Sequence, residues 1–317
     1  MTTQLFNVGQ TFGVKAPAAL VIEGFSATDH PLIPPATPYV FRQGLAALIA
    51  FLRDPAGDAF LLTGPTGSGK TSLVCQVAAR LNWPVQSVTC HGRLELSDLV
   101  GQFVLIDGST RFVHGPLAVA VREGHLLLLN EIDLMDPAEL AGLNDVIEGQ
   151  PLVIAQNGGE VIRPHPKFRV FATGNSAGAG DTTGLYQGVL RQNLAFLDRF
   201  RVLPVGYLEP EVELGVLAGA VPSLPPEVGE KLIAVANEVR RLFVGEGEST
   251  AQLTITLSTR TLVRWARLAL TFRGAPQPIR FALEQALTAR ADPDQREAIH
   301  RVAADVMGDL WIGSPAA

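Results

Sequence analysis

The sequence predicts an α/β fold in which helices cover both faces of a five-stranded parallel β-sheet and a helical domain follows. Five short apolar runs alternate with segments of helical periodicity, and this alternation is typical of a parallel sheet. The predicted strands are residues 59–62, 85–90, 125–129, 169–173 and 201–205. Beyond Pro204 the strand-like runs stop and apolar residues recur at helical spacing, which indicates a helical C-terminal third.

Three segments follow one another along the chain. Residues 30–35 are rich in proline, which restricts both itself and the preceding residue, so this stretch is not helical. We therefore expect residues 1–35 to form an N-terminal arm. Residues 36–207 form the predicted α/β domain, beginning with a helix over 44–52, and residues 208–317 form the helical domain.

Two β-hairpins interrupt the alternation of strands and helices. Residues 103–113 contain Asp107-Gly108 and residues 151–163 contain Asn157-Gly158; Asp-Gly and Asn-Gly are strong hairpin signals. Between the hairpins, the chemistry of Asp136, Pro137 and Glu139 predicts a capped helix start with a capping box. That helix is predicted to run to about Glu148.

The helical domain is predicted to contain four helices. They cover residues 231–243, 261–270, 278–290 and 293–307. Ser258 or Thr259 is the expected cap of the second of these helices, and Asp292 that of the fourth. A glycine- and glutamate-rich loop is expected over residues 245–249.

The composition excludes several classes of protein. A chain of 317 residues that is 47% hydrophobic and 18% charged is neither disordered nor fibrous. No apolar run approaches the roughly 18 residues of a membrane span, and the N-terminus lacks the pattern of a secretory signal, so we expect a soluble, cytoplasmic protein. Cys75 and Cys90 are the only cysteines and both are expected to be buried thiols, while the dispersed histidines predict no transition-metal site. A net charge of −6 argues against broad nucleic-acid binding.

A phosphate-binding loop follows the first predicted strand. Its residues match G-x-x-x-x-G-K-[ST]: Gly64, Pro65, Thr66, Gly67, Ser68, Gly69, Lys70 and Thr71. In such a loop the backbone N–H groups and the following helix, here residues 71–81, bind phosphate. Lys70 is expected to reach the β- and γ-phosphates and Thr71 to bind Mg²⁺. The motif accepts ATP or GTP.

The strand over 125–129 ends in Asn130-Glu131, where an Asp-Glu pair is usual. Glu131 is expected to orient and deprotonate the attacking water, whereas neutral Asn130 offers Mg²⁺ no charge and acts on it only indirectly. Asp133 is a candidate to compensate for that missing charge. Asn175 follows the strand over 169–173 and is expected to hold the water or the γ-phosphate at the same sheet edge.

Two arginines are candidates for contacts with the γ-phosphate. Arg199 precedes the last strand and is expected to stabilise the transition state in a neighbouring subunit, with Arg191 as its rival. Arg260 opens a helix of the helical domain and is expected to contact the nucleotide. The alternative for both Arg199 and Arg260 is an ordinary surface ion pair or a solvated side chain.

These motifs together resemble a known family. In chain order they are the phosphate loop, the strand ending in Glu131, Gly174-Asn175, Asp198-Arg199-Phe200 and Ser258-Thr259-Arg260. This order, with the two hairpins, resembles that of the MoxR-type AAA+ ATPases over residues 36–310. The strings at residues 79–84, 162–166 and 180–186 resemble more closely the AAA+ subunits of aerobic cobaltochelatases, the CobS group.

The resemblance implies an AAA+ P-loop NTPase with a C-terminal helical lid domain. It also implies a homo-oligomeric ring, usually a hexamer, with ATP and Mg²⁺ bound between subunits, and a partner that contains a von Willebrand factor A (VWA) domain. The implied activity is ATP-driven remodelling of a partner complex, which in the chelatases accompanies metal insertion into a corrin.

Two other functions remain as alternatives. Because Asn130 replaces the usual aspartate, the chain is a candidate for a nucleotide-gated scaffold with weak hydrolysis. A DNA-associated motor is a further alternative, which the acidic net charge disfavours.

Overall fold

The computed structural model describes residues 2–27, 29–41, 44–178, 180, 188–244 and 253–312. The chain divides into two compact units. The first comprises Met1–Pro65 and Gly69–Val205, and the second comprises Thr66–Ser68 and Gly206–Ala317. The sequence predicts a domain boundary after residue 207, two residues beyond the boundary between these units.

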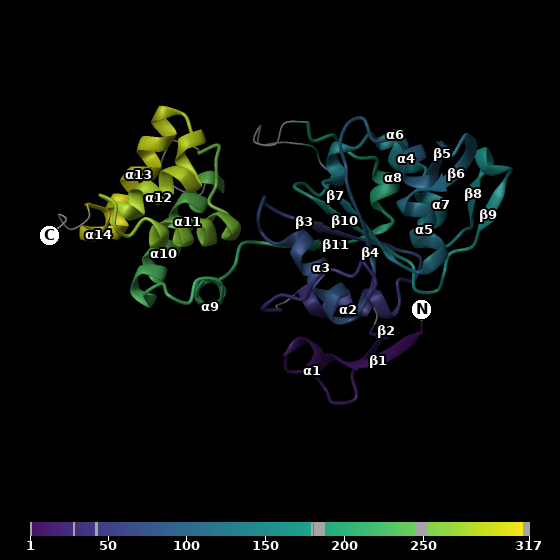
Figure 1. The fold of residues 1–317 in the computed structure, drawn as a ribbon, viewed down its shortest axis with the longest axis horizontal. Helices are drawn as coiled ribbons and strands as arrows, with labels where there is room; N and C mark the ends of the chain where they lie inside the picture. The colour runs from purple at the N-terminus through teal and green to yellow at the C-terminus, as the bar shows by residue number, and fades with distance from the viewer. Residues whose placement is uncertain are drawn as a thin grey trace. The chain divides into compact units, whose positions relative to one another are not determined.

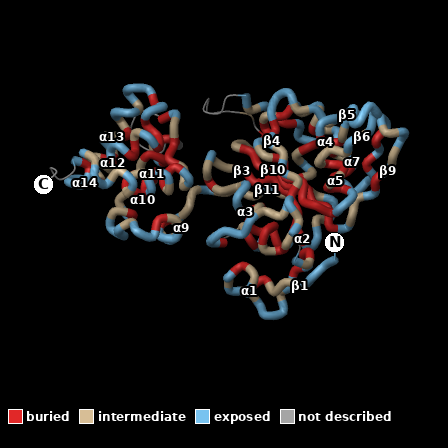
Figure 2. Tube along the Cα trace, viewed as in Figure 1, coloured by how far each residue is buried: buried red, intermediate tan, exposed pale blue. Residues whose placement is uncertain are grey.

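The first unit is built on a five-stranded parallel sheet (Figure 1). Its strands are β3 (Ala59–Thr63), β4 (Val85–Thr89), β7 (Leu126–Asn130), β10 (Arg169–Gly174) and β11 (Phe200–Pro204), in the spatial order β11-β3-β10-β7-β4. The predicted five-stranded parallel sheet is thus confirmed. The three central strands are almost entirely buried while the edge strands alternate (Figure 2), because only the central strands are covered on every side.

The two faces of the sheet belong to two separate apolar cores. Along β3, Ala59 and Leu61 pack into one core and Phe60 and Leu62 into the other, as the two-residue side-chain period of a strand requires. The first core adds α4 (Leu96–Val100) and α5 (Pro116–Glu123). The second adds α2 (Gly44–Arg53) and α3 (Lys70–Arg80). Helices therefore cover both faces.

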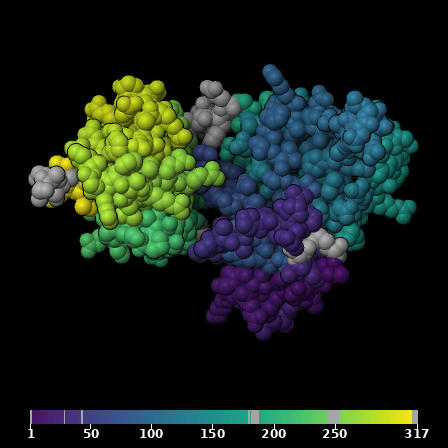
Figure 3. Space-filling model, viewed as in Figure 1, coloured from purple at the N-terminus to yellow at the C-terminus, as the bar shows by residue number. Residues whose placement is uncertain are grey.

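The N-terminal segment packs into the second core instead of projecting as an arm. It forms β1 (Thr3–Asn7), α1 (Val8–Phe12) and β2 (Val21–Phe25), with β1 and β2 antiparallel. Phe25 is 1% exposed and its ring lies edge-on to Trp83, with 5.8 Å between centroids. In the space-filling view these N-terminal residues lie against the rest of the first unit (Figure 3). The proline-rich stretch is non-helical, and the Val85 N–H donates to the Leu32 carbonyl at 2.9 Å.

Both predicted hairpins are present as separate two-stranded sheets. The first pairs β5 (Gly101–Ile106) with β6 (Ser109–His114), and its turn places Asp107 and Gly108 at φ 50° and 74°. The second pairs β8 (Leu152–Ile154) with β9 (Glu160–Ile162) through the short 3₁₀ turn η2 (Ala155–Asn157). Asp-Gly and Asn-Gly mark the turns because their backbones tolerate positive φ.

The helix predicted over 137–148 is broken in two, α6 (Pro137–Ala141) and α7 (Asn144–Ile147). Asp136 caps α6 as predicted, accepting from the Ala138 N–H at 2.8 Å. The predicted capping box is wrong. Glu139 accepts instead from the Leu96 N–H at 2.7 Å, and so satisfies the start of α4.

The regular elements among the described residues of the second unit are all helices. Its helices are α9 (Pro210–Ala220), α10 (Pro226–Val244), α11 (Thr259–Thr271), α12 (Pro278–Ala286), η3 (Thr288–Arg290), α13 (Pro293–Met307) and α14 (Asp309–Ile312). Ser258 caps α11 through the Thr261 N–H at 3.1 Å, whereas Asp292 makes no cap bond to α13, contrary to prediction. The loop expected over 245–249 lies outside the described residues. Within the described residues of the whole chain, no helix is both long enough and apolar enough to cross a membrane.

Candidate nucleotide-binding site

The phosphate loop and the polar groups at the ends of β7 and β10 lie at one edge of the sheet, whereas Arg199 precedes β11 and lies at the opposite edge. Parallel pairing aligns Thr63 of β3 with Gly174 of β10 and Pro204 of β11, and Asn130 of β7 with Thr89 of β4. The residues that follow these strands therefore lie at the carboxyl edge, where open α/β sheets bind their ligands. The two hairpins do not extend this edge, because each forms a sheet of its own.

Glycines give the phosphate loop its backbone conformation. Gly64 has a φ of 139°, and a Cβ there would lie 2.2 Å from the Val205 carbonyl oxygen, so no other residue fits. Gly69 has a φ of 95° and precedes α3 without any side-chain cap, and the first turn of α3 carries no acidic residue. The first N–H groups of the helix are thus not bonded by a capping side chain, and the helix dipole is not neutralised. Such a terminus fits a phosphate group.

Lys70 closes the loop on itself. Its Nζ donates to the carbonyls of Gly64 at 2.6 Å and Pro65 at 3.0 Å, and to Oδ1 of Asn175 at 3.3 Å. Burial lowers the pKa of Lys70 to about 8, although the charges of Asp133 and Glu131 oppose this shift. The ammonium therefore lies in a half-buried site that would gain from an additional negative charge.

Thr71 and Asn130 place two oxygen atoms side by side. The Thr71 hydroxyl donates to Oδ1 of Asn130 at 2.7 Å, and the Asn130 amide nitrogen donates to Oγ of Ser87 at 3.0 Å. The second bond orients the amide so that its oxygen faces Thr71. A hydroxyl and an amide oxygen suit Mg²⁺ in type, so the residues present fit a Mg²⁺–nucleotide complex. The pair supplies no negative charge.

Glu131 adopts a backbone conformation that is rare for a residue with a side chain. Its φ and ψ are 56° and 46°, in the left-handed region, and its N–H donates to Oγ1 of Thr173 at 3.2 Å. Such a conformation costs about 1–2 kcal/mol. The chain reverses here from β7 into η1 (Ile132–Leu134), and the Glu131 side chain remains exposed. An exposed carboxylate at this edge is free to contact water.

Asp133 connects the ends of two strands. It is 1% exposed, and its Oδ2 accepts from the backbone N–H groups of Asn175 at 2.8 Å and Ser176 at 3.2 Å. The sequence suggests Asp133 as a substitute for the charge missing at Asn130; the structure shows it binding the loop after β10. The one sequence signal for this structural role of Asp133 is that it stands among apolar residues, two positions after Glu131. Asn175, held by Asp133, in turn accepts from Lys70.

The candidate arginines differ in their surroundings. Arg199 forms an ion pair with Glu148, with Nη2 to Oε1 at 2.6 Å, and also donates to the Ala195 carbonyl. Arg191 is exposed and has no ion pair within the described part of the chain. Within one chain, therefore, Arg199 forms an ion pair, as the alternative interpretation from the sequence proposed.

Arg260 belongs to the second unit, near the start of α11. A buried ion pair fixes this helix start: both Nη atoms of Arg240 bind the Glu213 carboxylate, at 2.7 and 2.8 Å, and the Thr259 hydroxyl donates to the same carboxylate at 2.6 Å. The Arg260 side chain is exposed. The network was not predicted, because Glu213 and Arg240 look like surface residues in the sequence.

The two cysteines differ from each other. Cys90 is buried, and burial raises its pKa to about 12, so its thiol is unreactive. Cys75 is only partly buried, which corrects the expectation of two buried thiols. Among the described contacts, the thiol of neither cysteine forms a hydrogen bond to a predicted site residue.

Two family models match most of the chain in sequence. Residues 59–200 match the AAA domain (dynein-related subfamily), and residues 213–306 match the CbbQ/NirQ/NorQ C-terminal domain. The matched ranges contain the complete phosphate loop, Glu131 and Asn175 in the first case and Arg260 in the second.

Individual relatives extend over most of the chain. The aerobic cobaltochelatase subunit CobS of Sinorhizobium sp is 32% identical over 278 residues, which cover 84% of this chain and 80% of that protein. Protein NorQ of Paracoccus denitrificans is 29% identical over 249 residues, covering 78% of this chain and 86% of that protein. A solved structure of a RuvB mutant from Thermotoga maritima shares the fold, with a TM-score of 0.50 at 15% identity over 87% of this chain and 80% of that one. The string resembling the CobS group at 180–186 lies mostly outside the described residues.

The low pKa of Lys70 predicts proton uptake when a nucleotide binds. Below its pKa of about 8 the lysine is already protonated; above it, a bound polyphosphate favours the protonated form and draws in a proton. We expect uptake of about 0.75 proton at pH 8.5 and about 0.1 at pH 7 for a group titrating near 8. Calorimetric titration with ATP in buffers of different ionisation enthalpy measures this uptake. Lys70→Arg, which stays protonated, should show none; equal uptake at both pH values in the natural chain would contradict the assignment.

The Asp133 bridge predicts a specific loss of stability. Asp133→Ala leaves the partly buried N–H groups of Asn175 and Ser176 without their acceptor. Since a fully buried unsatisfied donor costs about 1–3 kcal/mol, we expect the free energy of unfolding to fall by about 2 kcal/mol. Asp133→Asn retains an acceptor oxygen and should lose less. Urea denaturation followed by tryptophan fluorescence makes the measurement, and Asp145→Ala, at an exposed position, is the control. A loss no larger than that of the control would exclude the bridge.

Proposed function

This chain belongs to the family of AAA ATPases that includes CobS and NorQ, and from this membership we propose that it is an ATP-driven motor that remodels a partner protein complex. The proposed working form is a homo-oligomeric ring, hexameric in the family pattern, with ATP and Mg²⁺ bound between subunits. A VWA-domain protein is the proposed partner.

One observation carries the proposal. At a single sheet edge the fold assembles an uncapped helix N-terminus, the Lys70 ammonium, the Thr71–Asn130 oxygen pair and the Asn175 amide. Each of these groups suits a different part of a magnesium–triphosphate complex. A strand-to-helix turn that binds no ligand would need only the glycines. It would not need the half-buried Lys70, whose pKa is lowered by burial.

We assign the following roles within one subunit. Bound ATP supplies the phosphoryl group that is transferred to water. Residues 64–69 and the start of α3 bind the phosphates through backbone N–H groups, and Lys70 neutralises their charge. Thr71 holds Mg²⁺ and Asn130 supports it. Glu131 orients the attacking water and accepts its proton, while Asn175 holds the water or the γ-phosphate.

The arginines extend the site beyond one subunit. Arg199 is proposed to stabilise the charge of the transition state in the neighbouring subunit, which requires it to exchange Glu148 for the phosphate. Arg191, exposed and without a carboxylate partner among the described residues, is the alternative for the same role. Arg260, on the start of α11, is proposed to respond to the phosphate state and thereby move the helical domain.

A second function is favoured by a particular observation. Asn130 keeps the hydrogen bond to Thr71 at 2.7 Å but carries no charge. A ring that binds ATP through intact phosphate contacts and hydrolyses it slowly would act as a nucleotide-gated scaffold. A DNA-associated motor would show salt-sensitive DNA binding, and the net charge of −6 gives no support to it.

The role of Glu131 is tested by its isosteric amide. Glu131→Gln removes the proton acceptor and leaves the phosphate loop intact, so turnover should fall by about 10²- to 10⁴-fold, while ATP affinity remains within a few-fold. Phosphate release and calorimetric ATP binding give the two values. Turnover at the natural level would remove Glu131 from the mechanism.

The role of Arg199 is tested by mixing two inactive variants. In a mixed ring of Glu131→Gln and Arg199→Ala subunits, some sites combine a natural Glu131 with a natural Arg199 from the neighbour. If Arg199 acts between subunits, mixing therefore restores turnover that neither variant has alone. Arg191→Ala is tried in parallel. No recovery with either arginine variant would argue against a shared site.

The two functions are separated by restoring the charge at position 130. If the motor function holds, the natural chain already turns ATP over and Asn130→Asp changes the rate only slightly. If the scaffold function holds, the substitution raises turnover by at least about tenfold, equivalent to about 1.4 kcal/mol of transition-state stabilisation. Steady-state phosphate release with saturating ATP and Mg²⁺ distinguishes the outcomes.

A further inference from the structure

The second unit contains a pocket remote in sequence from the phosphate loop. Its volume is about 450 Å³, and its lining residues are Arg280, Pro293, Arg296, Glu297, His300, Arg301 and Trp311. They come from α12, α13 and the short α14. A volume of about 300–1,000 Å³ is typical of small-ligand sites. None of these residues takes part in the proposed ATPase chemistry.

The three arginines of the pocket are only loosely satisfied within the chain. Arg280 pairs with Glu284 at 3.3 Å on the surface of α12, and Arg301 pairs with Glu297 at 3.2 Å on the surface of α13. Such exposed pairs are worth less than about 1 kcal/mol. Arg296 has no carboxylate partner among the described contacts; its Nε and Nη2 donate to the carbonyls of Thr288 and Ala291, at 3.1 and 3.5 Å.

His300 lies in the pocket lining, and its pKa responds to the charges around it. The His300 ring lies 5.4 Å from that of Trp311, and its Nε2 is 2.9 Å from the Thr288 hydroxyl. Burial lowers the pKa of His300 first, followed by the positive charge of Arg280; Glu284 opposes the shift and Arg296 adds to it. The cations thus outweigh the carboxylate at this point, in a chain whose net charge is −6.

We propose that this pocket is an oxyanion-binding site of the helical domain, which takes a phosphate or carboxylate group. Guanidinium groups recognise both oxyanions through paired N–H donors. Arg296 is already oriented by two backbone carbonyls, so less side-chain freedom is lost when it binds. The volume leaves space for the molecule that carries the oxyanion, which is either a small phosphorylated compound or an acidic segment of a partner protein. The site does not depend on the ATPase assignment, because every lining residue lies in the second unit.

The test uses the full chain and two probes, inorganic pyrophosphate and hexaglutamate. NMR of the His300 imidazole and the Trp311 indole reports binding at the pocket itself, separately from any anion at the phosphate loop. We expect saturable shifts of both signals and a rise in the His300 pKa. Tighter binding of pyrophosphate identifies a small phosphate ligand, and tighter binding of the peptide identifies an acidic partner segment.

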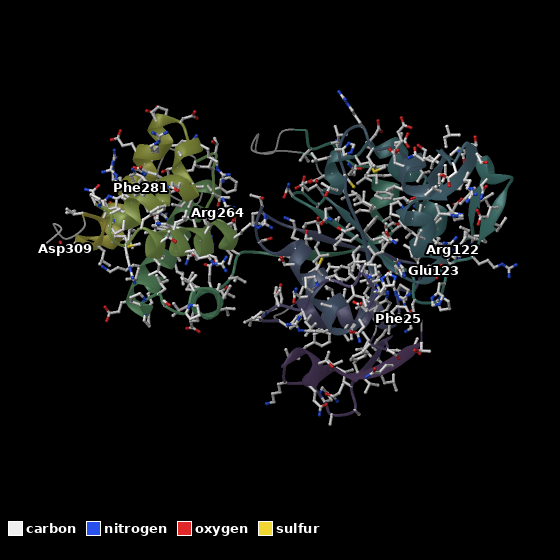
Figure 4. The ribbon with its side chains drawn as sticks, in the orientation of Figure 1. Phe25, Arg122, Glu123, Arg264, Phe281 and Asp309 are labelled. Carbon is white, nitrogen blue, oxygen red and sulfur yellow. The ribbon has the colours of Figure 1, made fainter. Side chains whose placement is uncertain are left out.

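Matched variants make the test specific. Arg296→Gln and Arg280→Gln should each weaken binding at least tenfold. Arg280→Gln removes only a surface pair with Glu284 and a charge near His300, so its folding is not at risk. Arg264→Gln is the control, because Arg264 is an exposed arginine on α11 outside the pocket lining (Figure 4). The proposal is overturned if neither probe shifts His300 and Trp311, or if Arg264→Gln weakens binding as much as the pocket variants do.

Discussion

The buried carboxylate of Asp133 is the interaction on which the candidate site depends. A carboxylate that is 1% exposed is costly to bury unless its oxygens are bonded. Two backbone N–H groups after β10 satisfy Oδ2, whereas Oδ1 has no hydrogen-bond partner among the described residues. The bridge holds the end of β10 against the residues that follow β7, and so fixes Asn175 within reach of Lys70. Without it, the sheet would still align its strands, but the loop carrying Asn175 would lose its attachment.

Charge balance at this edge follows from the same arrangement. The negative charges of Asp133 and Glu131 both raise the pKa of Lys70, while Asn130 contributes only an oriented dipole through its bond to Thr71. Replacing a carboxylate by an amide therefore preserves the geometry of the oxygen pair and removes part of the charge that would hold a cation. In the proposed mechanism, a substitution at position 130 would therefore affect hydrolysis more than binding, whereas one in the phosphate loop would affect both.

The parts of this structure that the sequence predicts are those governed by local patterns. Strand periodicity, the glycine positions of the phosphate loop and the two Gly-containing turns all depend on neighbouring residues, and they recur in the structure with small shifts of their ends. Contacts between distant residues were not predictable in this way. Glu139 binds the start of α4 instead of its own helix, and Arg199 pairs with Glu148, because in both cases the better partner lies far along the chain. The N-terminal segment likewise joins the core through Phe25 and Trp83, which no local signal links.

Each unit contains an arginine–glutamate ion pair near a candidate arginine or at it, and the two pairs differ in burial. In the second unit, the bidentate Glu213–Arg240 pair and the Thr259 hydroxyl hold the start of α11, so the exposed Arg260 moves with that unit as a whole. In the first unit, Arg199 is held by one hydrogen bond to the Ala195 carbonyl and by one ion pair, whose two side chains are 27% and 47% exposed. An exposed pair of this kind is readily exchanged. A buried pair resists exchange because breaking it leaves an uncompensated charge. The chain therefore combines a firmly held helix start, which carries the exposed Arg260, with an Arg199 side chain whose ion pair can be exchanged. In the proposed ring motor, the helix start would transmit a phosphate-dependent movement, and Arg199 would enter and leave a neighbour's site in each cycle.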